Sequence, residues 1–149
     1  MGGTILCDVT DSLAGRSAGE YAHALAARLG LRVVLVFVID GAVAARESVT
    51  GRQRQSGAEQ TLAATADELG GAETRLAFGD HAEVLATVAA EEGADLVILG
   101  SRAVGFGGRN LRCGLVRHLE AATPVPVLIA PPSTRRRSER RPAIGAASS

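Results

Sequence analysis

Residues 79–102 read GDHAEVLATVAAEEGADLVILGSR, a stretch that contains a helix start, an apolar helical face and a short apolar run. Asp80 is the expected N-cap of the helix, and Glu83 three residues later completes a capping box. Apolar residues then follow at helical spacing, namely Leu85, Val88 and Ala89. The run LVIL at residues 96–99 is typical of a strand that is covered on both faces. A helix that leads into a buried strand is the repeating unit of a parallel sheet.

Further runs extend this pattern along the chain. Three are apolar, at residues 4–9, 33–38 and 125–130, and one contains both polar and apolar residues, at residues 74–78. Continuous Val, Ile and Leu are expected in strands buried on both faces, whereas a mixture of polar and apolar residues indicates an edge strand with one wet face. Pro124 and Pro126 in the last run also favour a margin position. We therefore predict a five-stranded parallel sheet whose third and fifth strands lie at its margins.

Helical spacing of apolar residues recurs between these runs. Its positions are Ala18, Ala22, Leu25, Ala26 and Leu29, then Ala58, Leu62, Thr65, Ala66 and Leu69, and finally Leu115, Leu119 and Ala122. Gly30 and the pair Gly70 and Gly71 are the expected ends of the first two helices. Residues 41–55 have no clear period and are predicted to form a loop. The fold class predicted is α/β, with three layers and helices on both faces of the sheet.

The composition fits one folded domain followed by a tail. The chain has 149 residues, of which 46% are hydrophobic and 21% are charged, as in ordinary globular proteins. We assign residues 1–131 to the domain and residues 132–149 to a disordered tail, because the tail has no apolar period. No apolar run approaches the roughly 18 residues of a membrane span. We expect a cytoplasmic protein with no membrane association.

The tail is rich in arginine. It holds five Arg and one Glu between Arg135 and Arg141, a local charge of +4 in a chain whose formal net charge is zero. We interpret it as a solubilising extension, because no aromatic residues are interleaved for base stacking. Binding of nucleic acid is therefore not expected except through this basic tail.

Several classes of enzyme are excluded by composition. All 16 basic residues are Arg, so a Walker A loop and a lysine nucleophile are both ruled out. For His23, His81 and His118 we expect solvent-facing or capping roles, since they show no metal-ligand spacing. Asp8 is interpreted as a satisfied polar group at a strand end, with cation binding as the alternative. We expect no enzyme, with ATP hydrolysis weak at most, and no metal site.

The strongest candidate for a site is a glycine-rich stretch. Ligands of parallel α/β sheets bind beyond the carboxyl ends of the strands, at residues 9–15, 38–41 and 100–114 in this chain. The last of these stretches reads GSRAVGFGGRNLRCG and precedes a helix. Glycine lets the backbone approach an anion, the helix start supplies N–H groups, and Arg102 adds positive charge. The stretch predicts a phosphate site, with a tight glycine-rich turn as the alternative.

Residues 79–102 and the ending TPVPVLIAP resemble the second half of universal stress proteins. That family has a Gly-Asp start, an acidic helix end, an ADLIVMGSRG-like strand and turn, and a final CPVLVV strand. With the first strand, the first helix and VID at residues 38–40, the resemblance covers residues 4–131. It implies a five-stranded parallel sheet in the order 3-2-1-4-5 and a homodimer formed through the last strand.

The family's phosphate motif is only partly present. Nucleotide-binding members use Gly-x-x-Gly, nine residues, and then Gly followed by Ser or Thr. Aligned without gaps, Gly100 matches, whereas Ala103, Cys113 and Gly114 stand at the other three positions. A one-residue shift makes Gly114 the third glycine, with Gly105 or Gly107 able to restore the loop. An added methyl costs about 1 kcal/mol where φ is positive and little where φ is negative, and a lost hydroxyl costs about 1 kcal/mol. Together they weaken binding by roughly one to two orders of magnitude.

The resemblance implies an adenine-nucleotide site at the tips of the first and fourth strands, in a stress-response or regulatory protein. ATP or AMP is the expected ligand, with Mg²⁺ only if ATP is bound. Thr10 stands where the family has an aspartate that contacts the nucleoside. The expected contact residues are Asp8, Val9, Thr10, Asp11, Val38, Leu99, Gly100, Arg102, Ala103, Gly105, Cys113, Gly114 and Leu115. The alternative is a dimeric interaction module of the same family that binds no nucleotide.

Cys113 also raises a redox question. It lies beside Arg112 at an expected helix start, a setting that can lower the pKa of a thiol. We interpret it as an ordinary, partly buried cysteine, with redox sensitivity as the alternative. Cys7 and Cys113 have no CxxC companion, so neither a disulfide framework nor a zinc cluster is expected.

Overall fold

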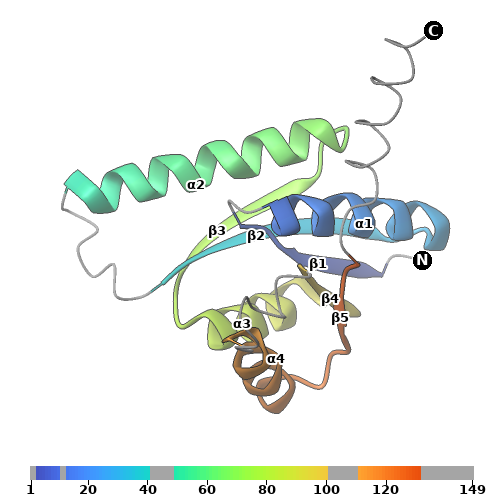
Figure 1. Ribbon diagram of the computed structural model, residues 1–149. Coiled ribbons are helices and arrows are strands. Elements are labelled where there is room, and N and C mark those ends of the chain that lie inside the picture. Colours follow the sequence, from blue (N-terminus) through green and yellow to red (C-terminus); the bar gives the residue numbers. More distant parts are fainter. Residues whose placement is uncertain (1–2, 11–12, 41–48, 101–110, 132–149) are drawn as a thin grey trace, which may run out of the picture.

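The computed structural model describes residues 3–10, 13–40, 49–100 and 111–131. Strands and helices alternate along them: β1 (Thr4–Asp8), α1 (Leu13–Leu29), β2 (Arg32–Asp40), α2 (Val49–Glu68), β3 (Glu73–Gly79), α3 (His81–Glu92), β4 (Leu96–Leu99), α4 (Leu111–Ala122) and β5 (Val127–Ile129). All neighbouring strands are parallel, and their order is β3-β2-β1-β4-β5. The predicted fold class and strand order are confirmed, with β3 and β5 at the margins (Figure 1).

The core consists of two apolar layers, one on each face of the sheet. Helices α1 and α2 cover one face, where Ile5 and Cys7 are buried, and α3 and α4 cover the other, where Leu6 is buried (Figure 1). Successive residues of a strand point to opposite faces, so β1 contributes to both layers. All five residues of β1 are buried. The central strand β1 therefore packs against α1 on one face and against α3 on the other.

The predicted helix ends agree well with the structure. Gly30, Gly70 and Gly71 have φ values of 69°, 80° and 99°, which is the backbone region that glycine adopts without strain. At the start of α3 the Asp80 carboxylate accepts a hydrogen bond from the Glu83 N–H at 3.1 Å, as expected for an N-cap. The apolar runs were located correctly, although β1 ends at Asp8 and β5 is limited to Val127–Ile129.

The prediction of a loop over residues 41–55 is wrong for its second part, because α2 begins at Val49. Gly51 and Gly57 interrupt the apolar period there, and the residues between Gly51 and Gln55 are exposed and polar. The sequence shows no helical period in this part, and packing of α2 on β2 and β3 stabilises the helix instead.

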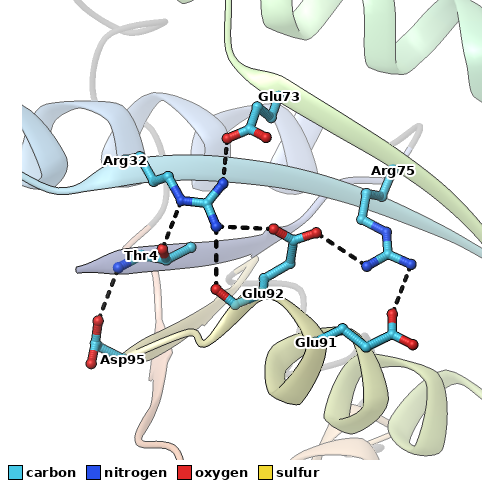
Figure 2. Close-up of polar contacts among 7 residues, drawn as sticks. All are labelled: Thr4, Arg32, Glu73, Arg75, Glu91, Glu92 and Asp95. Carbon is cyan, nitrogen blue, oxygen red and sulfur yellow. Dashed lines mark hydrogen bonds and ion pairs between the residues drawn. The ribbon is translucent and has the colours of Figure 1, made fainter. Parts of the chain in front are cut away.

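Charged side chains join the amino ends of the strands (Figure 2). Arg32 pairs with Glu73 and, at 3.0 Å, with Glu92. Arg75 pairs with Glu91 at 2.8 Å and with Glu92 at 3.1 Å. Hydrogen bonds to these carboxylates raise the pKa of both guanidinium groups. The largest effect comes from Glu73 for Arg32 and from Glu91 for Arg75. Glu92 thus ties the end of α3 to β2 and β3, at the edge of the sheet opposite the expected site.

The thiol of Cys7 is predicted to be inert in the folded protein. Cys7 is fully buried, and burial raises the pKa of its thiol, with the negative charge of Asp8 adding to the effect. In a Cys113→Ser variant we expect no alkylation of Cys7 by iodoacetamide at about pH 8.5, but complete alkylation in denaturant. Near that pH the thiol ionises only in the unfolded state. The free energy of unfolding is therefore unaffected by ionisation of Cys7 at neutral pH and falls as the pH rises above the pKa of the unfolded thiol. Labelling of the native protein at the rate of an exposed thiol would contradict the prediction.

Candidate functional site

The order of the strands reverses beside β1. The chain runs outward from β1 through β2 to β3 and then returns to place β4 on the other side of β1. The carboxyl ends of β1 and β4 therefore form the switch point at which parallel α/β sheets bind ligands. Hydrogen bonds fix both ends: the Val9 N–H donates to the Val36 carbonyl, and the Ala130 N–H donates to the Leu99 carbonyl, each at 2.8 Å.

Several of the predicted contact residues meet at this edge. Val9 and Thr10 follow β1, Val38 lies near the end of β2, and Leu99 and Gly100 end β4. Thr10 and Val38 are half-buried, whereas Val9 is buried. Leu99 is fully buried in the layer beneath α3 and α4, so it is the backbone of Leu99 that faces the edge.

Asp8 ends β1 and its side chain is fully buried, and the remaining predicted residues divide into two groups. Gly114 and Leu115 are half-buried in α4, and Cys113 belongs to the same helix. Asp11, Arg102, Ala103 and Gly105 lie outside the described residues. The glycine-rich stretch and its alternative registers thus stay predictions.

Gly15, on the first turn of α1, lies directly against Thr10. A Cβ atom built on Gly15 would come within 2.5 Å of the Thr10 backbone nitrogen, a separation that real side chains do not reach. Glycine is therefore required for α1 to begin so close to the end of β1. The sequence placed Gly15 in the loop after the first strand but did not identify this contact, because its only signal was a glycine near a helix start.

A buried aspartate and a histidine meet at the same edge. Asp8 is the last residue of β1 and its side chain is 0% exposed, and His81 is the first residue of α3. The Nε2 atom of His81 lies 3.0 Å from each carboxylate oxygen of Asp8. The expectation that Asp8 is a satisfied polar group is confirmed. The His81 side chain is 35% exposed, but a capping role for it is wrong, because Asp80 is the cap and the His81 ring contacts Asp8.

The turn before α3 directs His81 toward β1. Gly79 has a φ of 139°, and a Cβ atom at this position would lie 2.8 Å from Cγ2 of Val84. A side chain at residue 79 would therefore push the start of α3 away from β3. His23 and His118 are exposed, as predicted. His81 is thus the described histidine that the fold brings to the carboxyl edge.

The described residues show which chemical groups are available at the carboxyl edge. Among residues 3–10, 13–40, 49–100 and 111–131, no group of three or more His, Cys, Asp or Glu side chains is placed to hold a metal ion. Within these ranges, no helix is long and apolar enough to cross a membrane. In the described part of the chain, the edge offers backbone N–H groups, the Thr10 hydroxyl, apolar side chains and the Asp8–His81 pair.

A parallel sheet with a switch point between β1 and β4 places this chain in the class of doubly wound α/β proteins. The sequence profile of the Universal stress protein family matches residues 1–131. The chain belongs to the universal stress protein family. A search of curated proteins gave no significant match.

Solved structures of the same family share the fold. A protein of the universal stress protein family from Burkholderia pseudomallei is 26% identical, covers 87% of this chain and 96% of its own, and has a TM-score of 0.58. A universal stress protein in complex with cAMP is 20% identical, covers 88% and 98%, and has a TM-score of 0.68. The protein from Archaeoglobus fulgidus in complex with dAMP is 19% identical, covers 88% and 98%, and has a TM-score of 0.59.

Proposed function

We propose that this chain is a stress-response or regulatory protein that binds an adenine nucleotide, ATP or AMP, at the carboxyl ends of β1 and β4. The observation that carries the proposal is the convergence of Val9, Thr10, Val38 and Gly100 on the switch point of the sheet. The complexes of related proteins with cAMP and dAMP support the class of ligand.

Each part of the edge suits a different part of a nucleotide. The half-buried side chain of Val38 offers an apolar surface for the base, and the Thr10 hydroxyl can hydrogen-bond the ribose. Gly100, buried at the end of β4, begins the glycine-rich sequence that would receive the phosphates. Mg²⁺ would accompany ATP only. We propose a binding role, with ATP hydrolysis weak at most.

The alternative is a dimeric interaction module that binds no nucleotide. Ala103, Cys113 and Gly114, which replace motif residues of nucleotide-binding relatives, favour it. The open side of β5 suits the dimer, because β5 lies at the margin of the sheet and Ile129 on it is 36% exposed. We propose that a homodimer forms along this strand in either case.

Titration calorimetry of the full chain with AMP and ATP tests the proposed function. We expect dissociation constants on the order of 0.1 mM, because the motif is incomplete. GMP serves as the matched control, and we expect weaker binding of GMP. No heat of binding with AMP or ATP at millimolar concentration rejects nucleotide binding and favours the interaction module.

A Thr10→Asp substitution is expected to strengthen binding. An aspartate here can accept hydrogen bonds from both ribose hydroxyls, and a charged acceptor makes stronger hydrogen bonds than a neutral hydroxyl. We expect the affinity for AMP to rise about tenfold, equivalent to about 1.4 kcal/mol. The same calorimetry measures this change in affinity, with Thr10→Ala as the matched variant. 2′,3′-Dideoxy-AMP is the control ligand, because it lacks the ribose hydroxyls and so cannot bind more tightly through them. An equal gain for both ligands, or no gain for AMP, would show that Thr10 does not face the ribose.

A further inference from the structure

The Asp8–His81 pair lies at the same edge of the sheet as the proposed nucleotide contacts. The Asp8 carboxylate is fully buried, and its backbone leads directly to Val9 and Thr10. The His81 side chain is 35% exposed, and its Nε2 atom is 3.0 Å from both oxygens of Asp8. One member of the pair is thus sealed in the protein, while the other still reaches water.

The number of protons on this pair determines its net charge. With Asp8 ionised and His81 protonated the pair is neutral overall, whereas loss of that proton leaves a net charge of −1. A net charge is penalised more than a neutral pair when water is removed, since solvation of an ion is lost without compensation. A molecule that covers the exposed part of His81 therefore favours the state that holds the proton.

Acidic neighbours act in the same direction. On α3 itself, Asp80 precedes His81 and Glu83 follows it in the first turn. On β1, Cys7 is a buried thiol whose pKa is raised, so it stays neutral. From α4, the exposed His118 lines a pocket of about 420 Å³ together with Asp80 and Glu83. The acidic groups among them, Asp80 and Glu83, favour a protonated imidazole.

We propose that the Asp8–His81 pair is a proton-linked part of the ligand site, so that a nucleoside or nucleotide occupying the carboxyl edge drives uptake of a proton onto the pair. This inference rests on the proposed function, because it needs the edge to be the place where the ligand binds. An anionic ligand adds its own attraction for the imidazolium to the effect of covering the ring. The linkage is therefore larger for a nucleotide than for its nucleoside.

Calorimetry with cAMP and adenosine measures this linkage, because neither ligand changes charge over the range in which histidine titrates. We expect the affinity for cAMP to be about three- to tenfold higher at roughly pH 6 than at roughly pH 8, and the change for adenosine to be smaller. The sign follows because protonation is favoured in the bound state, so the gain is lost as the pH rises. Repeating the titrations in two buffers with different ionisation enthalpies gives the number of protons taken up.

His81→Gln and His23→Gln form the matched pair of variants. Gln keeps a donor for Asp8 but cannot take up a proton, so His81→Gln removes the pH dependence. His23 is exposed on α1, so His23→Gln retains the pH dependence. Imidazole NMR signals of the wild-type protein add a measurement that needs no substitution at residue 81. The signal of His81 moves toward the imidazolium position when cAMP is added at about pH 7.

The outcomes separate the two proposals. Binding of both ligands with no pH dependence and no proton uptake would overturn the inference alone, and so would pH dependence that persists in His81→Gln. Absence of binding for cAMP, adenosine, AMP and ATP alike would overturn the proposed function and this inference with it.

Discussion

Replacing His81 with Leu is expected to lower the free energy of unfolding by about 2–3 kcal/mol. The Asp8 carboxylate is 0% exposed, so it cannot recover the lost Nε2 contacts from water. Leu also cannot donate a hydrogen bond, and its apolar side chain would face a buried charge. Urea denaturation followed by circular dichroism measures the change.

Two further variants identify the cause of that loss. His81→Gln keeps one donor and is expected to cost only about 1 kcal/mol. Asp8→Asn removes the charge, so adding His81→Leu to it should cost clearly less than adding His81→Leu to the wild type. If His81→Leu lay within about 0.5 kcal/mol of the wild type, the contact with Asp8 would have no energetic weight.

Leu85→Ala is expected to destabilise the protein by about 3 kcal/mol, within the range for a fully buried leucine. Leu85 is 0% exposed on α3 and packs in the apolar layer between the sheet and α3 and α4. Removing its side chain leaves a cavity that the strands cannot fill without moving. Thermal or urea unfolding gives the difference from the wild type.

Thr87→Ala is the matched control for Leu85→Ala. Thr87 is exposed on the same helix, and its hydroxyl donates only to the Glu83 carbonyl within that helix. We expect a change within about 0.5 kcal/mol, because surface substitutions in helices have small effects. A loss below about 1 kcal/mol for Leu85→Ala would mean that α3 does not pack on the sheet as described.

The fold could be predicted because buried strands and helix faces consist largely of apolar residues, which can be recognised in the sequence. β1, β2 and β4 are buried on both faces, and their sequences are nearly continuous in apolar residues. β3 lies at the margin of the sheet beside β2, and its residues 75–79 are half-buried, which fits its mixture of polar and apolar residues. The first turns of α2 left no such trace: the glycines and polar residues after Val49 have no helical period, and their helix depends on contacts with β2 and β3.

The site could be predicted in its position but not in its contacts. The rule for parallel sheets placed it at the carboxyl ends of β1 and β4, and Thr10, Val38 and Gly100 do lie at that edge. Asp8 and His81 are 73 residues apart, so no spacing in the sequence could indicate that they meet. Each was considered alone, and alone each had an ordinary explanation. The contact of Gly15 with Thr10 was missed for the same reason, because it depends on where α1 crosses the end of β1.

The position of the nucleotide is tested most directly by backbone NMR of the full chain during a titration with AMP. We expect the amide signals of Val9, Thr10 and Gly100 and the imidazole signal of His81 to move together in proportion to occupancy. Signals at the amino edge, such as those of Arg32 and Glu73, should stay in place, because they lie at the opposite ends of the strands. Changes confined to the amino edge, or no changes at saturating AMP, would contradict a nucleotide site at the ends of β1 and β4.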